Sequence, residues 1–140
     1  MKRQLLSIFA VCSLATVLVA PLCAQSLGGI GVNIPFEFVA QGKTLLSGQY
    51  YLQPVGSSLM IKSADGKTRA FVLTNSVYGQ ATENQLRLVF HRYADTHFLS
   101  QVWSPENRIV GYQLPRTKLE IEMAKGTPGF QKESIVAQGK

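Results

Sequence analysis

The sequence predicts a single mainly-β domain: an antiparallel β-barrel or β-sandwich of seven or eight strands, with one short helix near the C-terminus. Apolar residues alternate with others from Val32 to Phe38, as they do in a strand with one buried face. The dipeptide Asp65-Gly66 separates two further apolar runs and is typical of a hairpin turn. Turn residues also recur at even spacing along the rest of the chain. These observations indicate the fold class and leave barrel and sandwich open.

The N-terminal segment has the three parts of a signal peptide. Lys2-Arg3 is a short positive region, and Leu5–Ala20 is a nearly unbroken apolar run. Ala24 is a small residue of the kind that signal peptidase accepts at its cleavage site. We therefore expect residues 1–24 to be a signal peptide, and residues 25–140 to form one exported β-rich domain in the periplasm or outside the cell.

Two other readings of this segment are weaker. A retained membrane anchor would need a longer span, whereas this apolar run has the length of a signal region and ends at Pro21. Lipidation of Cys23 would favour a small residue before it, and Leu22 stands there. The mature protein is thus predicted to have no stable membrane anchor.

Cleavage also changes the composition of the protein. Both cysteines, Cys12 and Cys23, leave with the signal peptide, so the mature chain has no thiol, disulfide or cysteine-ligated metal. Removing Lys2-Arg3 from the 14 basic residues leaves 12 against eight acidic ones, a net charge of +4. These basic residues are scattered, which argues against nucleic-acid binding and is compatible with loose attraction to anionic envelope polymers.

The segment from Pro35 to Tyr50 carries a family resemblance. It resembles the pattern P-F-x-F-x-x-x-G-K-T-L-P-A-G-x-Y, found in small exported proteins of unknown function from soil bacteria. Leu46-Ser47 stands where that pattern has Pro-Ala. The resemblance implies export and a β-rich domain, and it implies no activity. The residues that carry it are Phe36, Phe38, Gly42, Lys43, Thr44, Leu45, Gly48 and Tyr50.

The first strands are separated by glycine turns. A strand over residues 32–39 is followed by turns at Gly42-Lys43 and Ser47-Gly48, and then by a second strand over residues 50–55.

The next two strands are expected to form a hairpin. Residues 58–63 and 68–78 flank Asp65-Gly66, which suits a two-residue type I′ turn because both central residues need positive φ. We expect the first two cross-strand pairs of this hairpin to build one continuous apolar face. Two like charges form a further pair; binding of an anion between them is one interpretation, and solvation of both is the simpler expectation. The predicted pairs are Leu59–Val72, Met60–Phe71 and Lys62–Arg69.

A second hairpin is predicted downstream. Residues 85–93 and 97–104 form its strands, with the turn at Ala94-Asp95-Thr96. Another strand covers residues 108–114 and ends at Pro115.

The pattern then changes to that of a helix over residues 118–125. Thr117 and Glu120 have the spacing of a capping box, and Gly126 stands at the C′ position. A strand is the alternative, because apolar residues alternate there too. Residues 132–137 are expected to add a last strand.

The candidates for chemistry are His91 and His97. An odd-numbered loop would pair the two rings on one face, whereas a two-residue loop would place His97 opposite Arg92 and His91 beside Phe98. Asp95 is the one further ligand near them in sequence, and a closed zinc site needs four. We therefore assign no catalytic, cofactor-binding or metal residue and expect no cofactor.

We expect an exported, non-catalytic binding or structural module of the periplasm or cell envelope, whose partner is another protein or an envelope polymer. One alternative is a small-ligand carrier with a barrel cavity. A less favoured one is a hydrolase that uses His91 or His97.

The secreted product should begin at Gln25, because cleavage is expected after Ala24. N-terminal sequencing of exported protein checks this directly. A chain that starts at Met1, or one with a lipid on Cys23, would contradict the signal-peptide assignment.

Overall fold

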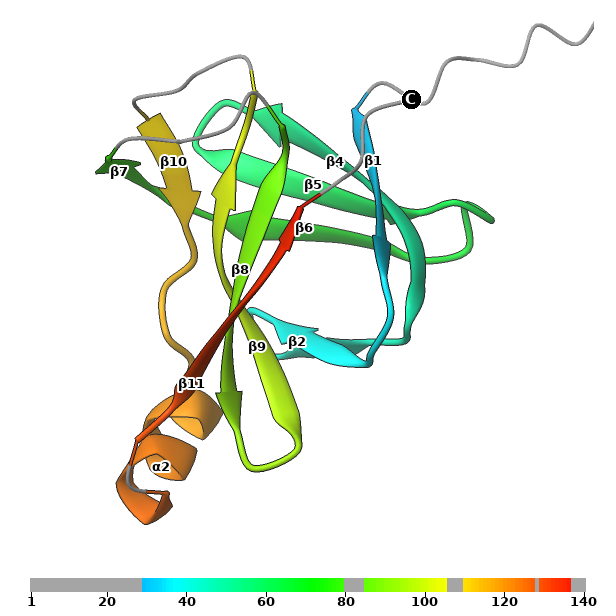
Figure 1. Cartoon of the computed structure of the whole chain (residues 1–140). Coiled ribbons are helices and arrows are strands. Elements are labelled where there is room, and N and C mark those ends of the chain that lie inside the picture. The colour runs from blue at the N-terminus through cyan, green and yellow to red at the C-terminus, as the bar shows by residue number, and fades with distance from the viewer. Residues whose placement is uncertain (1–28, 80–84, 106–109, 128, 137–140) are drawn as a thin grey trace, which may run out of the picture.

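A computed structural model describes residues 29–79, 85–105, 110–127 and 129–136 (Figure 1). The predicted signal peptide, residues 1–24, lies outside these ranges. No helix in the described ranges is long and apolar enough to cross a membrane.

The described residues form eleven strands and one helix (Figure 1). They are β1 (Ile30–Ile34), β2 (Phe38–Ala40), β3 (Lys43–Leu45), β4 (Gly48–Val55), β5 (Ser58–Ser63), β6 (Arg69–Leu73), β7 (Asn75–Tyr78), β8 (Arg87–Tyr93), β9 (Thr96–Trp103), β10 (Val110–Gln113), α2 (Lys118–Gly126) and β11 (Gln131–Val136).

The strands form two sheets. One has the order β1-β4-β5-β6, and the other has β11-β8-β9-β10-β7, with β2 paired to β9 and β3 paired to β2. All of these pairs are antiparallel except β2 with β9, which run parallel. The two sheets face each other across one hydrophobic core, so the mainly-β prediction is confirmed in the form of a sandwich with one short helix.

The described part of the structure has three more strands than the eight predicted, because two apolar runs divide and Lys43–Leu45, which follows the predicted glycine turn, forms the additional strand β3. The first run breaks between Ile34 and Phe38, around Pro35, which has no backbone N–H to donate. The second breaks at Thr74, whose backbone N–H and hydroxyl both donate to the carbonyl of Ser57, at 3.0 and 3.1 Å. The chain passes there from β6 in one sheet to β7 in the other.

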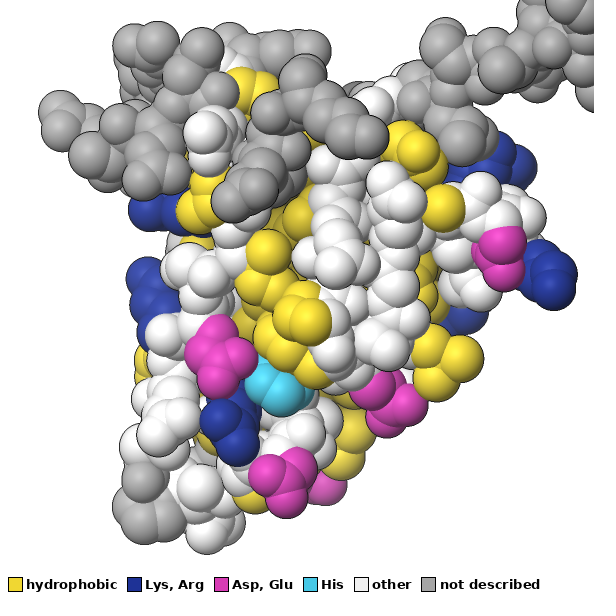
Figure 2. Space-filling view, turned by 45° about the vertical axis from the view of Figure 1, so that its right-hand side comes forward, with side chains coloured by type: hydrophobic (Ala, Val, Ile, Leu, Met, Phe, Trp, Pro, Cys, Tyr) yellow, Lys and Arg dark blue, Asp and Glu magenta, His cyan; other side chains and the backbone are white. Residues whose placement is uncertain are grey.

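The core follows the alternation of the strands. Leu59 and Ile61 on β5, and Val72 on β6, are buried between the sheets with Leu52 of β4 and Leu88 of β8. A smaller cluster packs Met123 and Ala124 of α2 against aromatic residues at one end of the β8–β9 hairpin. Figure 2 shows a band of hydrophobic side chains on one face, with charged side chains mainly at its margins.

The β5–β6 hairpin has the predicted register and a different turn. Leu59 pairs with Val72, and Met60 with Phe71. These two pairs point to opposite faces, so the expected continuous apolar face is wrong: the first pair is buried, while the side chain of Phe71 is 61% exposed. The loop is longer than two residues, because the N–H of Ser63 donates to the carbonyl of Thr68 at 2.9 Å.

Positive φ in this loop occurs at Gly66 and not at Asp65, so the turn is not type I′. A two-residue turn with positive φ at both positions lies instead at Gln41 and Gly42, with φ of 48° and 83°. This turn joins β2 to β3. The turn type predicted for the β5–β6 hairpin is therefore found two hairpins earlier in the chain.

The β2–β3 turn also joins the two sheets at the free edge of β6. The side-chain oxygen of Gln41 accepts from the N–H of Leu73 at 2.9 Å, and the ammonium of Lys43 donates to the carbonyl of Arg69 at 3.1 Å. Backbone groups on an unpaired edge invite pairing with another strand. On β6 the carbonyl of Arg69 and the N–H of Leu73 already have hydrogen-bond partners.

The predicted helix forms, but some contacts at its two ends differ from those predicted. The hydroxyl of Thr117 accepts from the N–H of Glu120 at 3.2 Å, as the capping box predicts. The Glu120 carboxylate faces His91 and Arg116, so it does not complete the box. Gly126 is the last helical residue and does not have positive φ, and Thr127 is the C-cap, so the C′ assignment is wrong.

Glycine at position 66 should matter to stability because its φ of 72° strains any other residue. Gly66→Ala should lower the free energy of unfolding by about 1 to 2 kcal/mol. A Cβ there meets nothing closer than Lys62 Cε at 3.8 Å, so the cost is conformational rather than a clash.

Gly126→Ala is the matched control, since a Cβ at that position meets nothing within 4 Å and its φ is not positive. It should leave stability unchanged or raise it by up to about 1 kcal/mol. Chemical denaturation of both variants makes the comparison, and equal losses would contradict the assigned hairpin turn.

Candidate functional site

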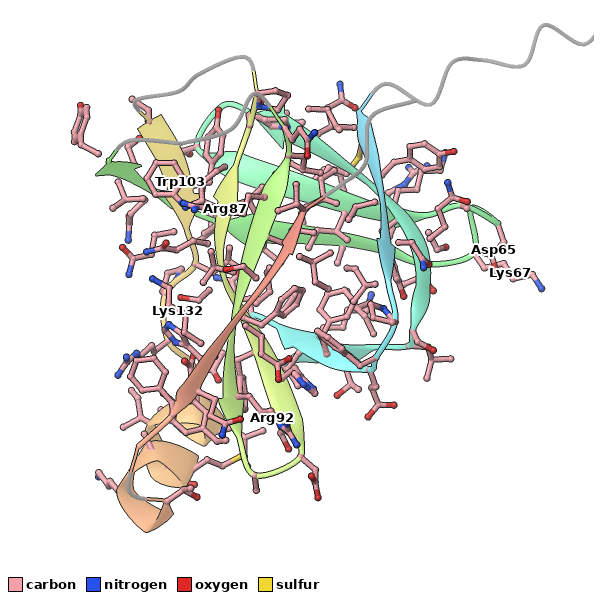
Figure 3. The ribbon with its side chains drawn as sticks, viewed as in Figure 1. Asp65, Lys67, Arg87, Arg92, Trp103 and Lys132 are labelled. Atoms are coloured by element: carbon pink, nitrogen blue, oxygen red, sulfur yellow. The ribbon has the colours of Figure 1, made fainter. Side chains whose placement is uncertain are left out.

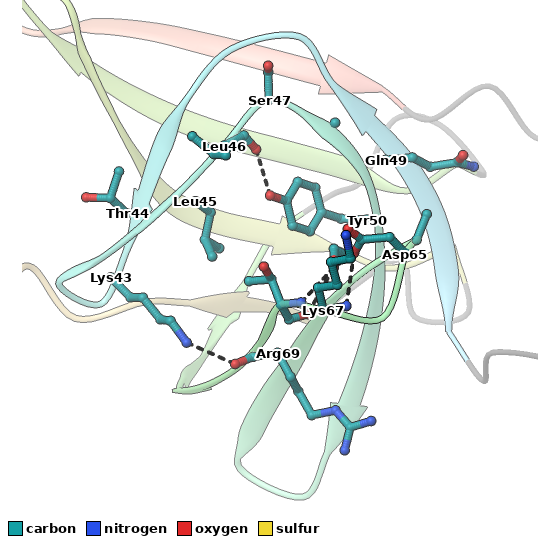
Figure 4. A pocket seen from close by; sticks show the side chains of 14 residues that line it. Lys43, Thr44, Leu45, Leu46, Ser47, Gln49, Tyr50, Asp65, Lys67 and Arg69 are labelled. Carbon is teal, nitrogen blue, oxygen red and sulfur yellow. Dashed lines mark hydrogen bonds between the residues drawn. The ribbon is translucent and has the colours of Figure 1, made fainter.

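A groove lies between the β3–β4 segment and the β5–β6 hairpin (Figure 4). Its volume is about 730 Å³. Residues 43–50 form one side, and residues 63–65 and 67–69 form the other. The β4–β5 pairing brings the two sides together, because Tyr50 lies opposite Ser63.

Tyr50 contributes both to the core and to the groove. Its side chain is almost fully buried, and its hydroxyl donates to the carbonyl of Leu46 at 2.6 Å (Figure 4). Burial, with a smaller contribution from the negative charge of Asp65, raises the pKa of the Tyr50 phenol above its usual value. The phenol is therefore a neutral donor that holds Leu46 at the lip of the groove.

Lys43 extends from β3 toward β6. Its ammonium donates to the carbonyl of Arg69, as Figure 4 shows, and an ammonium has three donors in all. Lys43 is exposed, so its remaining donors face solvent. The guanidinium of Arg69 points away from Lys43 (Figure 4).

The hairpin turn on the opposite side is organised by Asp65. Its carboxylate accepts from the hydroxyl of Ser63 and from the backbone N–H of Lys67, the latter at 3.0 Å. These hydrogen bonds, the one from Ser63 first, lower the pKa of Asp65 below its usual value. Asp65 and Lys67 lie together at the tip of the hairpin (Figure 3).

Positive charge is concentrated around this groove. Four basic residues and one acidic residue, Asp65, lie on β3 and the β5–β6 hairpin, whereas the rest of the described chain has six basic and five acidic residues. The ion pairs among the described residues all involve other positions, so these four cations have no carboxylate partner within 4.0 Å. The four are Lys43, Lys62, Lys67 and Arg69.

The two histidines lie on opposite faces of the β8–β9 hairpin. His97 pairs with Arg92, and His91 with Phe98, which is the register of a two-residue turn. Ala94 and Asp95 form that turn, and Ala94 has a φ of 51°. The register that would bring both rings to one face is therefore not formed.

Each histidine has its own carboxylate. His91 Nδ1 lies 3.0 Å from Glu120 Oε1; the Glu120 side chain is buried, and that of His91 is 12% exposed. His97 Nε2 lies 3.2 Å from Glu133 Oε2, which belongs to a carboxylate that also contacts Arg92 at 3.3 Å. The ring of His97 stacks on Phe36 with a centroid distance of 3.8 Å. Both rings thus join elements of the fold together.

The contacts of His91 and His97 indicate a structural role rather than a catalytic one. Asp95, the third ligand considered from the sequence, is fully exposed and lies 3.6 Å from Arg92. Within the described ranges, no group of three or more histidine, cysteine, aspartate or glutamate side chains is arranged to hold a metal ion.

Sequence reasoning missed the groove. Its two sides are separated along the chain and meet only through the pairing of β4 with β5. A partial signal existed, because Lys43, Thr44, Leu45, Gly48 and Tyr50 belong to the pattern noted above and all line the groove. No comparable signal in the sequence indicated the contact between Glu120 and His91.

Comparisons of the chain with protein-family models, with curated proteins and with solved structures find no match. The site is therefore interpreted from its own geometry and charge.

The two histidine–carboxylate pairs should differ in energetic coupling. A double-mutant cycle of His91→Ala with Glu120→Gln should give a coupling free energy of about 1 to 3 kcal/mol, because the Glu120 carboxylate is buried and its other cationic contact, with Arg116, is longer at 3.8 Å. The cycle of His97→Ala with Glu133→Gln is the control.

That control should give about 0.5 kcal/mol, since the Glu133 side chain is 33% exposed and keeps Arg92 as a partner. Denaturant unfolding of the wild type and the six variants supplies both values. A larger coupling at His97 than at His91 would show that this account of the two pairs is wrong.

Proposed function

We propose that this protein is an exported, non-catalytic module of the cell envelope that binds an anionic polymer in the groove between β3–β4 and the β5–β6 hairpin. The observation that carries the proposal is the pair of lysines on opposite sides of the groove, Lys43 and Lys67, neither of which has a carboxylate of the described residues within ion-pair distance. Phosphate and carboxylate groups are the ligands that such ammonium groups favour.

The other groups in the groove support a polyanionic ligand. Thr44, Ser47 and Thr68 add neutral hydroxyls to the lining, and these can donate to oxygen atoms of a phosphate or a sugar. The volume of about 730 Å³ lies in the range of pockets that hold small molecules, and it suits a short segment of a longer chain.

Several features favour binding without catalysis. The lining contains no histidine or cysteine. The pKa of Asp65 is lowered and that of Tyr50 is raised, so each group is held away from titration near neutral pH. The two histidines that a hydrolase would use lie on other elements and face structural partners.

The proposal is tested with the double variant Lys43→Ala/Lys67→Ala. Its matched control is Lys118→Ala/Lys125→Ala, which removes the same charge from exposed positions of α2. Poly(glycerol phosphate) and polygalacturonate serve as probes, with dextran as the uncharged comparison, in titration calorimetry at several salt concentrations. We expect the groove variant to bind about a hundredfold more weakly, which is tenfold for each charged hydrogen bond lost, and the control to stay within about threefold.

Three outcomes of this experiment would contradict the proposal. Equal losses in both variants would show that the attraction is spread over the whole surface. Dextran binding as tightly as the polyanions would show that charge is not recognised. Glycerol phosphate monomer binding as tightly as its polymer would favour the small-ligand carrier instead.

A further inference from the structure

The outer face of the β1-β4-β5-β6 sheet carries a group of exposed apolar side chains. Phe71 and Leu73 on the edge strand β6 are 61% and 60% exposed, and Val55 on β4 is 48% exposed. Met60 lies beside Phe71, and Ser58 lies between Leu73 and Val55, so the group spans three strands with one small polar residue among its members. We call Val55, Met60, Phe71 and Leu73 the apolar face.

Cations adjoin the apolar face. Lys62 and Arg69 form a cross-strand pair two residues nearer the hairpin turn than Met60–Phe71. By the alternation of the strands, both pairs face the same outer side of the sheet. The outward positions of β4, β5 and β6 contain no acidic residue, and all three strands lie within the described residues. Within the part of the chain that the structure describes, neither cation has a carboxylate within 4.0 Å.

We propose that this face binds the surface of an anionic lipid bilayer. Phe71, Leu73 and Val55 enter the headgroup region, while Lys62 and Arg69 contact lipid phosphates. Peripheral binding of this kind combines buried apolar area with attraction of basic residues to anionic lipid. An apolar face bordered by cations is complementary to that surface in both respects.

Two other occupants fit less well. A second copy of the chain, bound by the same face, would bring two sets of cations together with no acidic residue on either side. Addition of a foreign strand to β6 is opposed at both ends of the strand, where the carbonyl of Arg69 and the N–H of Leu73 already bond to Lys43 and Gln41.

The apolar face adjoins the groove through Arg69, which lines the groove. None of the four apolar residues lines it, so variants of Phe71 and Leu73 separate vesicle binding from polymer binding. This inference therefore does not rest on the proposed function.

The test uses sedimentation of the mature protein with vesicles of mixed phosphatidylcholine and phosphatidylglycerol, and with vesicles of phosphatidylcholine alone. Phe71→Ser/Leu73→Ser should reduce binding to the mixed vesicles about tenfold or more. Tyr78→Ser/Leu119→Ser removes two side chains that are 77% and 50% exposed elsewhere, and it should change binding less than about twofold.

A second measurement does not depend on losing binding. The emission of Phe71→Trp should shift to the blue when mixed vesicles are added, whereas Tyr78→Trp should show no shift; buried Trp103 is common to both. The shift should persist when Lys43→Ala/Lys67→Ala is added to Phe71→Trp, which separates this inference from the groove.

Several results would overturn the inference. These are equal binding to neutral and mixed vesicles, equal losses in the serine variant and its control, or no shift at position 71. A wild-type dimer that Phe71→Ser/Leu73→Ser dissociates, without any vesicle binding, would make the face an interface between copies. A soluble protein partner that needs Phe71, again without vesicle binding, would reject it too.

Discussion

The pairing of β5 with β6 is the constraint on which most of this structure depends. Its register sends Leu59 and Val72 into the core and turns Met60 and Phe71 to the outside. A slip of one residue would reverse every side chain of the hairpin, burying cations and exposing the core. The neighbouring pairing of β4 with β5 places one wall of the groove beside Tyr50, so core, groove and outer face follow from two adjacent strand pairings that share β5.

Charge is distributed unevenly between the two ends of the sandwich. At the end that carries α2, Glu120 and Glu133 are engaged by His91, Arg92 and His97, and these contacts hold the helix and β11 to the β8–β9 hairpin. The acidic residues used there are not available to balance the cations of β3, β5 and β6. Ion pairing that stabilises the end with α2 thus leaves an excess of positive charge at the other end.

Local sequence signals predicted local structure well. The spacing around Asp65-Gly66 was enough for the register of the hairpin, and Thr117 was enough for the start of the helix. Features that depend on distant segments were not predictable. The chain crosses at Thr74 from one sheet to the other, where the distant Ser57 carbonyl accepts both of its hydrogen bonds, and the groove exists because β4 pairs with β5. The sequence predicts only a capping-box role for Glu120, and its contact with His91 arises from tertiary packing.

The central claim is that the side of the sandwich built on β3, β5 and β6 is the binding side. Amide hydrogen exchange, measured with and without poly(glycerol phosphate), tests it residue by residue. The account predicts added protection in residues 43–49 and 64–68, with α2 and the β8–β9 hairpin unchanged. Added protection centred on α2 or on the β8–β9 hairpin, or spread evenly over the described strands, would contradict it.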